Sequence, residues 1–432
     1  MRLALALLGL LLAAGNAPAQ AVFRGDAART GVATSVAPRQ AVRVKWSFPT
    51  GQRIVSSAVW HQGAVLFGSD DGHVYAVDAS NGRQRWKART GGPVSSTPAV
   101  ADGRVYATSY DGRLYALDAE TGEVLWKFTT EGERRFEARG LHGQQPLQQT
   151  FADPFDVFLS SPVVAQGRVF FGSGDGHLYA VDAATGALHW KLRTGDVVHG
   201  SPACADGLVV VGSWDGRVYA ADASTGRLRW QFQGGVDPLL HNQQGFQASP
   251  AIADGMVYIG GRDAHVYAID TRTGAEKWRF ATGTSWVISS PAVAAGRVYF
   301  ATSDTSLVHA LDAATGRPVW QQQGQAYVFS SPTVAGTVLV LGVLNGTLEA
   351  RDLQTGERLW QWTTEAALAN IGWALTADGR INGAMLYAEG WHDSMAQGAG
   401  RQFAVGAIFA TPLVVDRVTY VGSTDGRMVA LE

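Results

Sequence analysis

The side chains that could do chemistry gather in three stretches of this 432-residue chain, 131–158, 233–247 and 363–409. Their charged, polar and aromatic members include Arg134, Arg135, Phe155, Asp156, His241, Trp373, Trp391 and His392. Aromatic rings among scattered polar groups suit a protein or peptide surface, or a site where a sugar or a quinone stacks. The three stretches could equally pack on one another and close the mouth of a channel.

No catalytic motif accompanies these residues. The sequence lacks G-x-S-x-G, H-E-x-x-H, a pair of cysteines and a phosphate-binding loop. Turns such as Asp70-Asp71-Gly72 lack the D-x-D-x-D-G ligand run of a calcium loop. We therefore predict no catalytic residue and no metal ligand.

A repeat of about 40 residues fills the rest of the chain. Each copy carries a Ser/Thr-Pro or similar pair, an Asp-Gly turn, a D-A-x-T-G turn and a strand with a tryptophan. The tryptophans are Trp46, Trp86, Trp126, Trp190, Trp230, Trp278, Trp320 and Trp360. We expect each to pack between neighbouring units, where burial stabilises by roughly 2–3 kcal/mol.

One copy, residues 97–128, divides into four short strands at 97–101, 104–109, 114–118 and 124–128. Each strand is β-rich and ends at a glycine-containing turn, which is typical of a meander of antiparallel strands. Such units repeated around an axis form a β-propeller. The last copy stops after its third strand at Glu432, and residues 42–48 supply a lone fourth strand with Trp46. The sequence predicts one domain, 22–432, with eight blades, the last closed by the N-terminal strand.

All three insertions follow a tryptophan strand, so we expect them on one face of the propeller. Trp286 and Tyr327 join them from shorter connections. A variable column three residues before each Pro position should face the channel, because side chains alternate along a strand. Its members are Val55, Ser95, Leu159, His199, Gln247, Ile288, Phe329 and Phe409. The preceding column, which includes Val198 and Phe158, is apolar and should be core.

The N-terminus predicts export. Arg2, an apolar run over residues 3–14 and the Ala-x-Ala pairs at 17–21 resemble a secretory signal, residues 1–21. We expect a periplasmic or secreted protein, without a lipid-bearing cysteine at the cleavage site. The single Cys204 excludes an intramolecular disulfide. A formal charge of −2 argues against nucleic acid, and no later segment is apolar enough to span a membrane. A monomer is expected.

The motif A-x-D-A-x-T-G-x-x-x-W, from Trp46 to Glu432, resembles the PQQ-like repeat of quinoprotein-type eight-bladed propellers. That resemblance implies either of two functions. One group holds PQQ- and Ca²⁺-dependent dehydrogenases of alcohols or sugars, but the alcohol dehydrogenases use a vicinal cysteine pair absent here. The other holds BamB-like exported propellers of outer membrane protein assembly, whose lipidated cysteine is also absent.

Length and repeat content favour the BamB-like group. The prediction is a cofactor-free, non-enzymatic protein that binds a protein or peptide, with the envelope assembly machinery as candidate partner. Its predicted binding face consists of Arg134, Arg135, Phe155, Asp156, His199, His241, Gln247, Trp286, Tyr327, Trp373, Trp391 and His392. The alternatives are a PQQ- and Ca²⁺-dependent dehydrogenase and a glycan-binding module.

Overall fold

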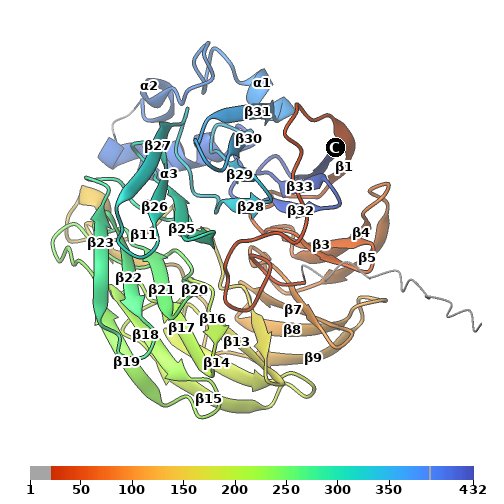
Figure 1. The fold of residues 1–432 in the computed structure, drawn as a ribbon, viewed down its shortest axis with the longest axis vertical. Helices are drawn as coiled ribbons and strands as arrows, with labels where there is room; N and C mark the ends of the chain where they lie inside the picture. Colours follow the sequence, from red (N-terminus) through yellow and green to blue (C-terminus); the bar gives the residue numbers. More distant parts are fainter. Residues whose placement is uncertain (1–20, 389–390) are drawn as a thin grey trace, which may run out of the picture.

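The computed structural model describes residues 21–388 and 391–432, without the side chains of 391–394. The predicted secretory signal therefore lies outside the described residues except for Ala21. The chain forms an eight-bladed β-propeller of four-stranded antiparallel blades, which confirms the predicted fold (Figure 1). None of the helices in the described part combines the length and the hydropathy that a membrane crossing needs.

Each blade runs from an innermost to an outermost strand. The innermost strands are β2 (Val59–His61), β6 (Ala99–Ala101), β12 (Val163–Ala165), β16 (Ala203–Ala205), β20 (Ala251–Ala253), β24 (Ala292–Ala294), β28 (Thr333–Ala335) and β32 (Leu413–Val415). The second strands are β3 (Ala64–Ser69), β7 (Arg104–Ser109), β13 (Arg168–Gly172), β17 (Leu208–Gly212), β21 (Met256–Gly260), β25 (Arg297–Ala301), β29 (Val338–Gly342) and β33 (Val418–Gly422).

The outer half of each blade carries the D-A-x-T-G turn. The third strands are β4 (His73–Asp78), β8 (Arg113–Asp118), β14 (His177–Asp182), β18 (Arg217–Asp222), β22 (His265–Asp270), β26 (Leu307–Asp312), β30 (Thr347–Asp352) and β34 (Arg427–Leu431). The outermost strands are β5 (Gln84–Arg89), β9 (Val124–Thr129), β15 (Leu188–Arg193), β19 (Leu228–Gln233), β23 (Glu276–Ala281), β27 (Pro318–Gln323), β31 (Arg358–Thr363) and β1 (Val44–Pro49).

The two ends of the chain share the eighth blade. Strand β1 pairs antiparallel with β34, which sets Trp46 opposite Ala430 and Phe48 opposite Met428. Because the N-terminal strand completes a blade begun by the C-terminal strands, backbone hydrogen bonds close the ring and no blade is left incomplete.

The repeated tryptophans join neighbouring blades, as predicted. The Trp230 indole N–H donates to the Thr271 carbonyl of the next blade at 2.7 Å. The same bond runs from Trp46, Trp86, Trp190, Trp278, Trp320 and Trp360 to Ala79, Ala119, Ala223, Ala313, Leu353 and Pro38. Except for Trp360, each of these indoles also lies against the glycine of the equivalent turn in the next blade, so the motif encodes both the turn and the contact between blades.

Gly226 tests this contact. A Cβ atom there would lie 2.5 Å from Trp190, and its φ is +72°. We expect Gly226→Ala to lower the free energy of unfolding by roughly 1–3 kcal/mol through both steric overlap and backbone strain. The control is Gly207→Ala, because Gly207 has a φ of +75° but no atom within 4 Å of the added Cβ. Chemical denaturation should show the larger loss for Gly226→Ala, and equal losses would contradict the contact.

The insertions carry most of the remaining structure. Residues 131–158 contain β10 (Glu137–Arg139), η1 (Leu141–Gly143) and β11 (Thr150–Ala152). Residues 363–409 contain α1 (Glu365–Ala369), α2 (Gly383–Leu386) and α3 (Trp391–Phe403). In Figure 1, these three helices lie over the sector of the blades that contain β27 to β31. The face that bears the insertions is called the crown below.

The crown and the closed channel

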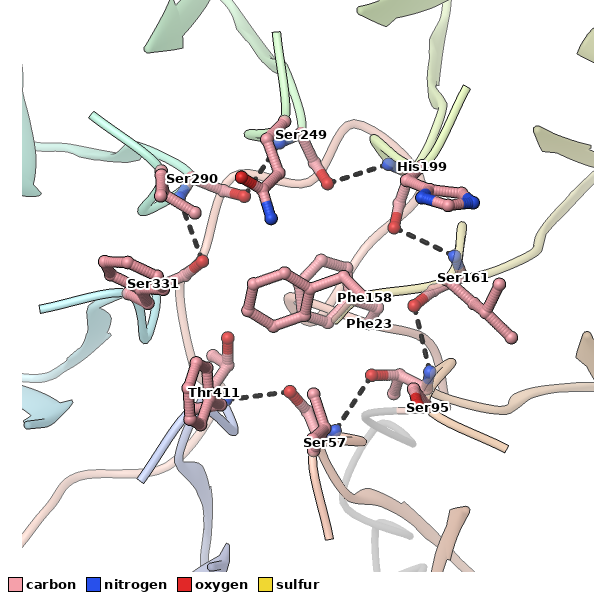
Figure 2. A pocket seen from close by; sticks show the side chains of 18 residues that line it. Phe23, Ser57, Ser95, Phe158, Ser161, His199, Ser249, Ser290, Ser331 and Thr411 are labelled. Atoms are coloured by element: carbon pink, nitrogen blue, oxygen red, sulfur yellow. Dashed lines mark hydrogen bonds between the residues drawn. The ribbon is translucent and has the colours of Figure 1, made fainter. Parts of the chain in front are cut away.

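A ring of hydroxyl groups lines the channel and explains the repeated Ser/Thr residues. The backbone N–H of one blade's Ser or Thr donates to the side-chain oxygen of the equivalent residue in the next blade, at 2.8–3.1 Å (Figure 2). These bonds join Ser57 to Thr97, Thr97 to Ser161, Ser161 to Ser201, Ser201 to Ser249, Ser249 to Ser290, Ser290 to Ser331, and Thr411 to Ser57. The residues that mark each repeat therefore also fasten the inner wall.

The variable column does face the channel. All eight of its members line the central cavity, together with Phe23 and Phe158. Phe158 was expected in the core, but its side chain is only partly buried and lies within the ring in Figure 2. The preceding Val157 is buried in the crown instead. The space that remains is about 30 Å³, enough for about two water molecules.

The first and third insertions pack together over the channel in one hydrophobic cluster, and the second insertion joins the first through His142 and Asn242, whose side chains lie 2.8 Å apart. Phe155 contacts Trp286 and Phe329 edge to face, each with ring centroids 6.0 Å apart. Phe403 from α3 meets Phe409 at 5.1 Å. The predicted placement of the insertions on one face is therefore correct, and their packing closes the channel on that side.

Five residues of the predicted binding face are buried within this crown: Phe155, Asp156, His199, Gln247 and Trp286. They support the crown from inside and do not form its outer surface, because the insertions fold over them. Of the others, Arg134 and Trp373 are exposed, and Arg135, His241 and Tyr327 are partly buried. The side chains of Trp391 and His392 lie outside the described residues.

His199 is a buried cation held between two carboxylates. Its Nδ1 lies 2.7 Å from Asp156 Oδ1 and its Nε2 lies 2.9 Å from Glu133 Oε1. The backbone N–H of Phe136 donates to Asp156 and that of Gly174 donates to Glu133. Burial lowers the pKa of His199, but the charges and hydrogen bonds of Asp156 and Glu133 outweigh it and raise the pKa to about 10. This network fastens the first insertion to the channel wall.

This network makes stability depend on pH. Because the folded pKa of about 10 lies above the ordinary 6.5, the contribution of His199 is complete below pH 6.5 and is lost as pH rises to 10. Between pH 6.5 and pH 10, the free energy of unfolding measured in urea should fall by up to about 1.4 kcal/mol per pH unit. The variant His199→Gln should lack this fall. His189→Gln, at a half-exposed site on β15, is the control. An unchanged slope in His199→Gln would contradict the prediction.

A second buried network joins the first two insertions to the fifth blade. The Arg262 guanidinium donates to Asp153, and His142 Nε2 lies 3.2 Å from the same carboxylate oxygen. Arg262 also lies between two indole rings, 4.5 Å from the centroid of Trp214 and 3.8 Å from that of Trp286. Burial raises the pKa of Asp153, but Arg262 and His142 outweigh it and hold the pKa well below its usual range.

Sequence reasoning missed Arg262, Trp214 and Glu133. A usable signal existed for the first two, since both occupy a variable position directly before the turn Asp of the repeat. In the first five blades that position holds Asp70, Tyr110, Gly174, Trp214 and Arg262. Glu133 had no such signal because it lies inside an insertion.

The outer surface of the crown is apolar in places. Fifteen large hydrophobic residues are exposed in the described part of the chain, and eight of these lie in the three insertions. The exposed hydrophobic residues of the first two insertions are here called the Leu239 patch: Leu147, Val236, Leu239 and Leu240. The backbone N–H of His142 donates to the Leu240 carbonyl at 2.8 Å and joins these two insertions. Leu368, Ile371, Trp373 and Met385 belong to the third insertion and form the Trp373 patch.

A groove of about 230 Å³ adjoins the Trp373 patch. Its lining includes the apolar Leu368, Ile371 and Leu375 and the amide-bearing Gln325, Asn345 and Gln361. Among the described residues, no three His, Cys, Asp or Glu side chains are grouped to hold a metal ion. The crown thus offers apolar and amide groups, which suit contact with a polypeptide.

Comparison with known proteins gives a family match over nearly the whole described chain. The model of the family described as outer membrane protein assembly factor BamB matches residues 29–155, 134–246, 236–390 and 305–432. Among curated proteins, BamB of Shewanella oneidensis is 27% identical over 164 residues, and that of Yersinia pestis is 26% identical over 165 residues. Each alignment covers 34% of this chain and only 41% or 42% of the relative.

Solved structures share the fold. BamB from Moraxella catarrhalis superposes with a TM-score of 0.64 at 17% identity, over 91% of this chain and 98% of that one. A europium-containing methanol dehydrogenase superposes with a TM-score of 0.67 at 16% identity, over 95% and 91%. At these identities the likeness extends to the architecture alone, which BamB and the methanol dehydrogenase have in common.

Proposed function

This chain belongs to the family described as outer membrane protein assembly factor BamB, and from that membership we propose that it is an exported, non-enzymatic binding protein. Its crown holds a protein partner in the cell envelope, in the periplasm, and the partner takes part in the assembly of outer membrane proteins. The observation that carries this proposal is the gathering of eight of the fifteen exposed hydrophobic residues on the insertions. Exposed apolar groups on one face of a rigid scaffold are typical of a protein interface.

The closed channel also favours binding at the surface. Sites for small molecules commonly enclose about 300–1,000 Å³, whereas the central cavity here encloses about 30 Å³. Phe158, Phe329 and Phe409 occupy the space where a flat ring would have to lie over the channel. The only cysteine, Cys204, is buried in the innermost strand β16 and cannot form a vicinal pair.

The residues present therefore do not fit a quinone with a calcium ion in this channel, and we propose that the protein works without a cofactor. Loading the purified protein with PQQ and Ca²⁺ and assaying dye-linked oxidation of alcohols and sugars tests this point. Turnover above that of the untreated protein would contradict the proposal.

Substitutions on the Leu239 patch should separate binding from stability. Leu239 is 82% exposed and Leu240 is 44% exposed, so Leu239→Asp with Leu240→Asp should leave the melting temperature within about 2 °C. A photo-crosslinking residue at Ile371 should capture an outer membrane assembly component or precursor in the periplasm. The double substitution should reduce that capture at least about tenfold, because charge at the centre of an apolar contact removes its desolvation gain.

The matched control is Leu188→Asp. Leu188 is 47% exposed on β15, away from the crown, so its substitution should leave capture unchanged. Equal loss in the control, or full capture by the crown variant, would overturn the assignment of the binding face.

A further inference from the structure

The segment from residue 21 to residue 41, here called the arm, lies against the innermost strands on the face opposite the crown. The repeat in the sequence predicts no strand for this segment. Its carbonyls accept backbone hydrogen bonds of 2.7–2.9 Å from the N–H groups of five blades: Ala21 from Val100, Ala27 from Cys204, Ala28 from Ile252, Thr30 from Val293 and Gly31 from Val334. Figure 1 shows the arm in red, crossing the inner ends of the blades. It therefore adds a further layer to the free edges of the innermost strands.

Two buried arginines fix the arm in place. Arg29 donates from Nε to the Pro202 carbonyl at 2.9 Å and from Nη2 to the Ser161 carbonyl at 2.9 Å. Arg24 donates from Nη2 to the Pro291 carbonyl at 2.6 Å and from Nη1 to the Pro332 carbonyl at 3.3 Å. These acceptors are the carbonyls of the repeated Ser/Thr-Pro pairs, so the propeller presents a ring of them at this mouth.

The charge of these guanidiniums is met by carbonyl dipoles. Among the described residues, neither arginine has a carboxylate within ion-pair distance, and Asp26 bonds to Thr30 instead. Burial lowers the pKa of Arg24 to about 9 and that of Arg29 to about 10, with Asp26 opposing the shift in both. The mouth therefore binds arginine through the placement of its carbonyl groups. These carbonyls accept the hydrogen bonds that the buried guanidinium can no longer make to water.

Docking of the arm is separable from closure of the ring. The ring is closed by β1, which begins at Val44, after the arm has ended. Release of the arm breaks its own bonds to the blades and no ladder bond within a blade. It would expose five unpaired strand N–H groups together with the carbonyl ring, and these are donors and acceptors that another peptide backbone and its arginines can bond.

We propose that the mouth opposite the crown is a peptide-binding site whose resident ligand is the chain's own arm. Its ligand class is a segment with two arginines five residues apart whose backbone turns at each arginine, as the arm does with φ of +63° at Arg24 and +61° at Arg29. A free segment of that kind can replace the arm. This site lies on the face opposite the crown, so a test of peptide binding here is independent of a test of the proposed function. In the intact chain the tethered arm competes at high effective concentration, which keeps the mouth closed.

Cys204 reports directly on the arm. It is the only cysteine, it is buried, and its N–H bonds to Ala27 of the arm. Labelling with a thiol reagent without denaturant should be at least about tenfold faster in the full-length double variant Arg24→Gln, Arg29→Gln than in the wild type. The control is Arg229→Gln, an exposed arginine on β19. Unchanged labelling in a folded double variant would overturn the proposal.

A synthetic peptide of residues 22–32 completes the test. It should bind the double variant in fluorescence anisotropy and slow the labelling of Cys204, whereas the same peptide with both arginines replaced by glutamine should do neither. Equal behaviour of the two peptides would overturn the arginine specificity.

Hydrogen exchange on the wild type does not depend on any variant folding. The amides of Val100, Cys204, Ile252 and Val293 should exchange together before the blade ladders, and exchange only on global unfolding would refute a separable arm.

Discussion

Replacing Arg262 with alanine is expected to lower the free energy of unfolding by about 3–5 kcal/mol. The reason is that the change strands Asp153, which is fully buried and whose carboxylate depends on Arg262 and His142 for its charge. It also removes the group that fills the space between the Trp214 and Trp286 rings. Urea unfolding followed by tryptophan fluorescence measures the loss.

Arg279→Ala is the matched control for that experiment. Arg279 pairs with Glu276 on β23, but its side chain is 56% exposed, so a loss below about 1 kcal/mol is expected. Adding Asp153→Asn to Arg262→Ala should recover part of the loss, because the stranded charge is then gone. A double-mutant cycle with no coupling between the two sites would show that Arg262 acts through packing alone.

Trp230→Ala is expected to lower the free energy of unfolding by about 3–5 kcal/mol. The indole is 8% exposed, donates to the Thr271 carbonyl at 2.7 Å and packs on the turn glycine of the next blade. Its loss leaves a void between two blades and an unpaired carbonyl. Thermal unfolding and urea unfolding both measure this loss of stability.

Trp373→Ala provides the comparison, since it removes the same side chain from the crown surface. Trp373 is 44% exposed, and its replacement should change the free energy of unfolding by about 0.5 kcal/mol or less. If the two substitutions cost the same, the repeated tryptophan does not hold the blades together as the structure indicates. The proposed function gives Trp373 a different readout, which is weaker capture of the partner.

The column that faces the channel shows how far local pattern can reach. Side chains alternate along a strand wherever it lies, so the register of His199 and Gln247 followed from their distance to the proline of the repeat. Phe158 departs from the pattern at the end of the first insertion, where Val157 packs into the crown and Phe158 turns toward the channel. Phe246 and Ile408, at the ends of the other two insertions, are buried in the core as predicted.

The crown shows the opposite case. Phe155 and Trp286 read as surface aromatics in the sequence, yet both are buried against residues far away along the chain. Asp153 and Arg262 are 109 residues apart, and no local spacing connects them. Whether an insertion residue is outside or inside depends on how three unrelated loops pack, and each loop occurs only once.

The sequence by itself determined the ring: the number of blades, the closure by the N-terminal strand, the packing of the tryptophans between blades and the face that carries the insertions. It could do so because turn chemistry and strand alternation are local, and eight near-copies repeat the same local evidence. Only the tertiary structure decided which crown residues are exposed, that His199 and Arg262 are buried charges, and that the arm occupies the opposite mouth. Those outcomes depend on contacts between segments distant in the chain, and their stability comes from desolvation and packing that no single segment encodes.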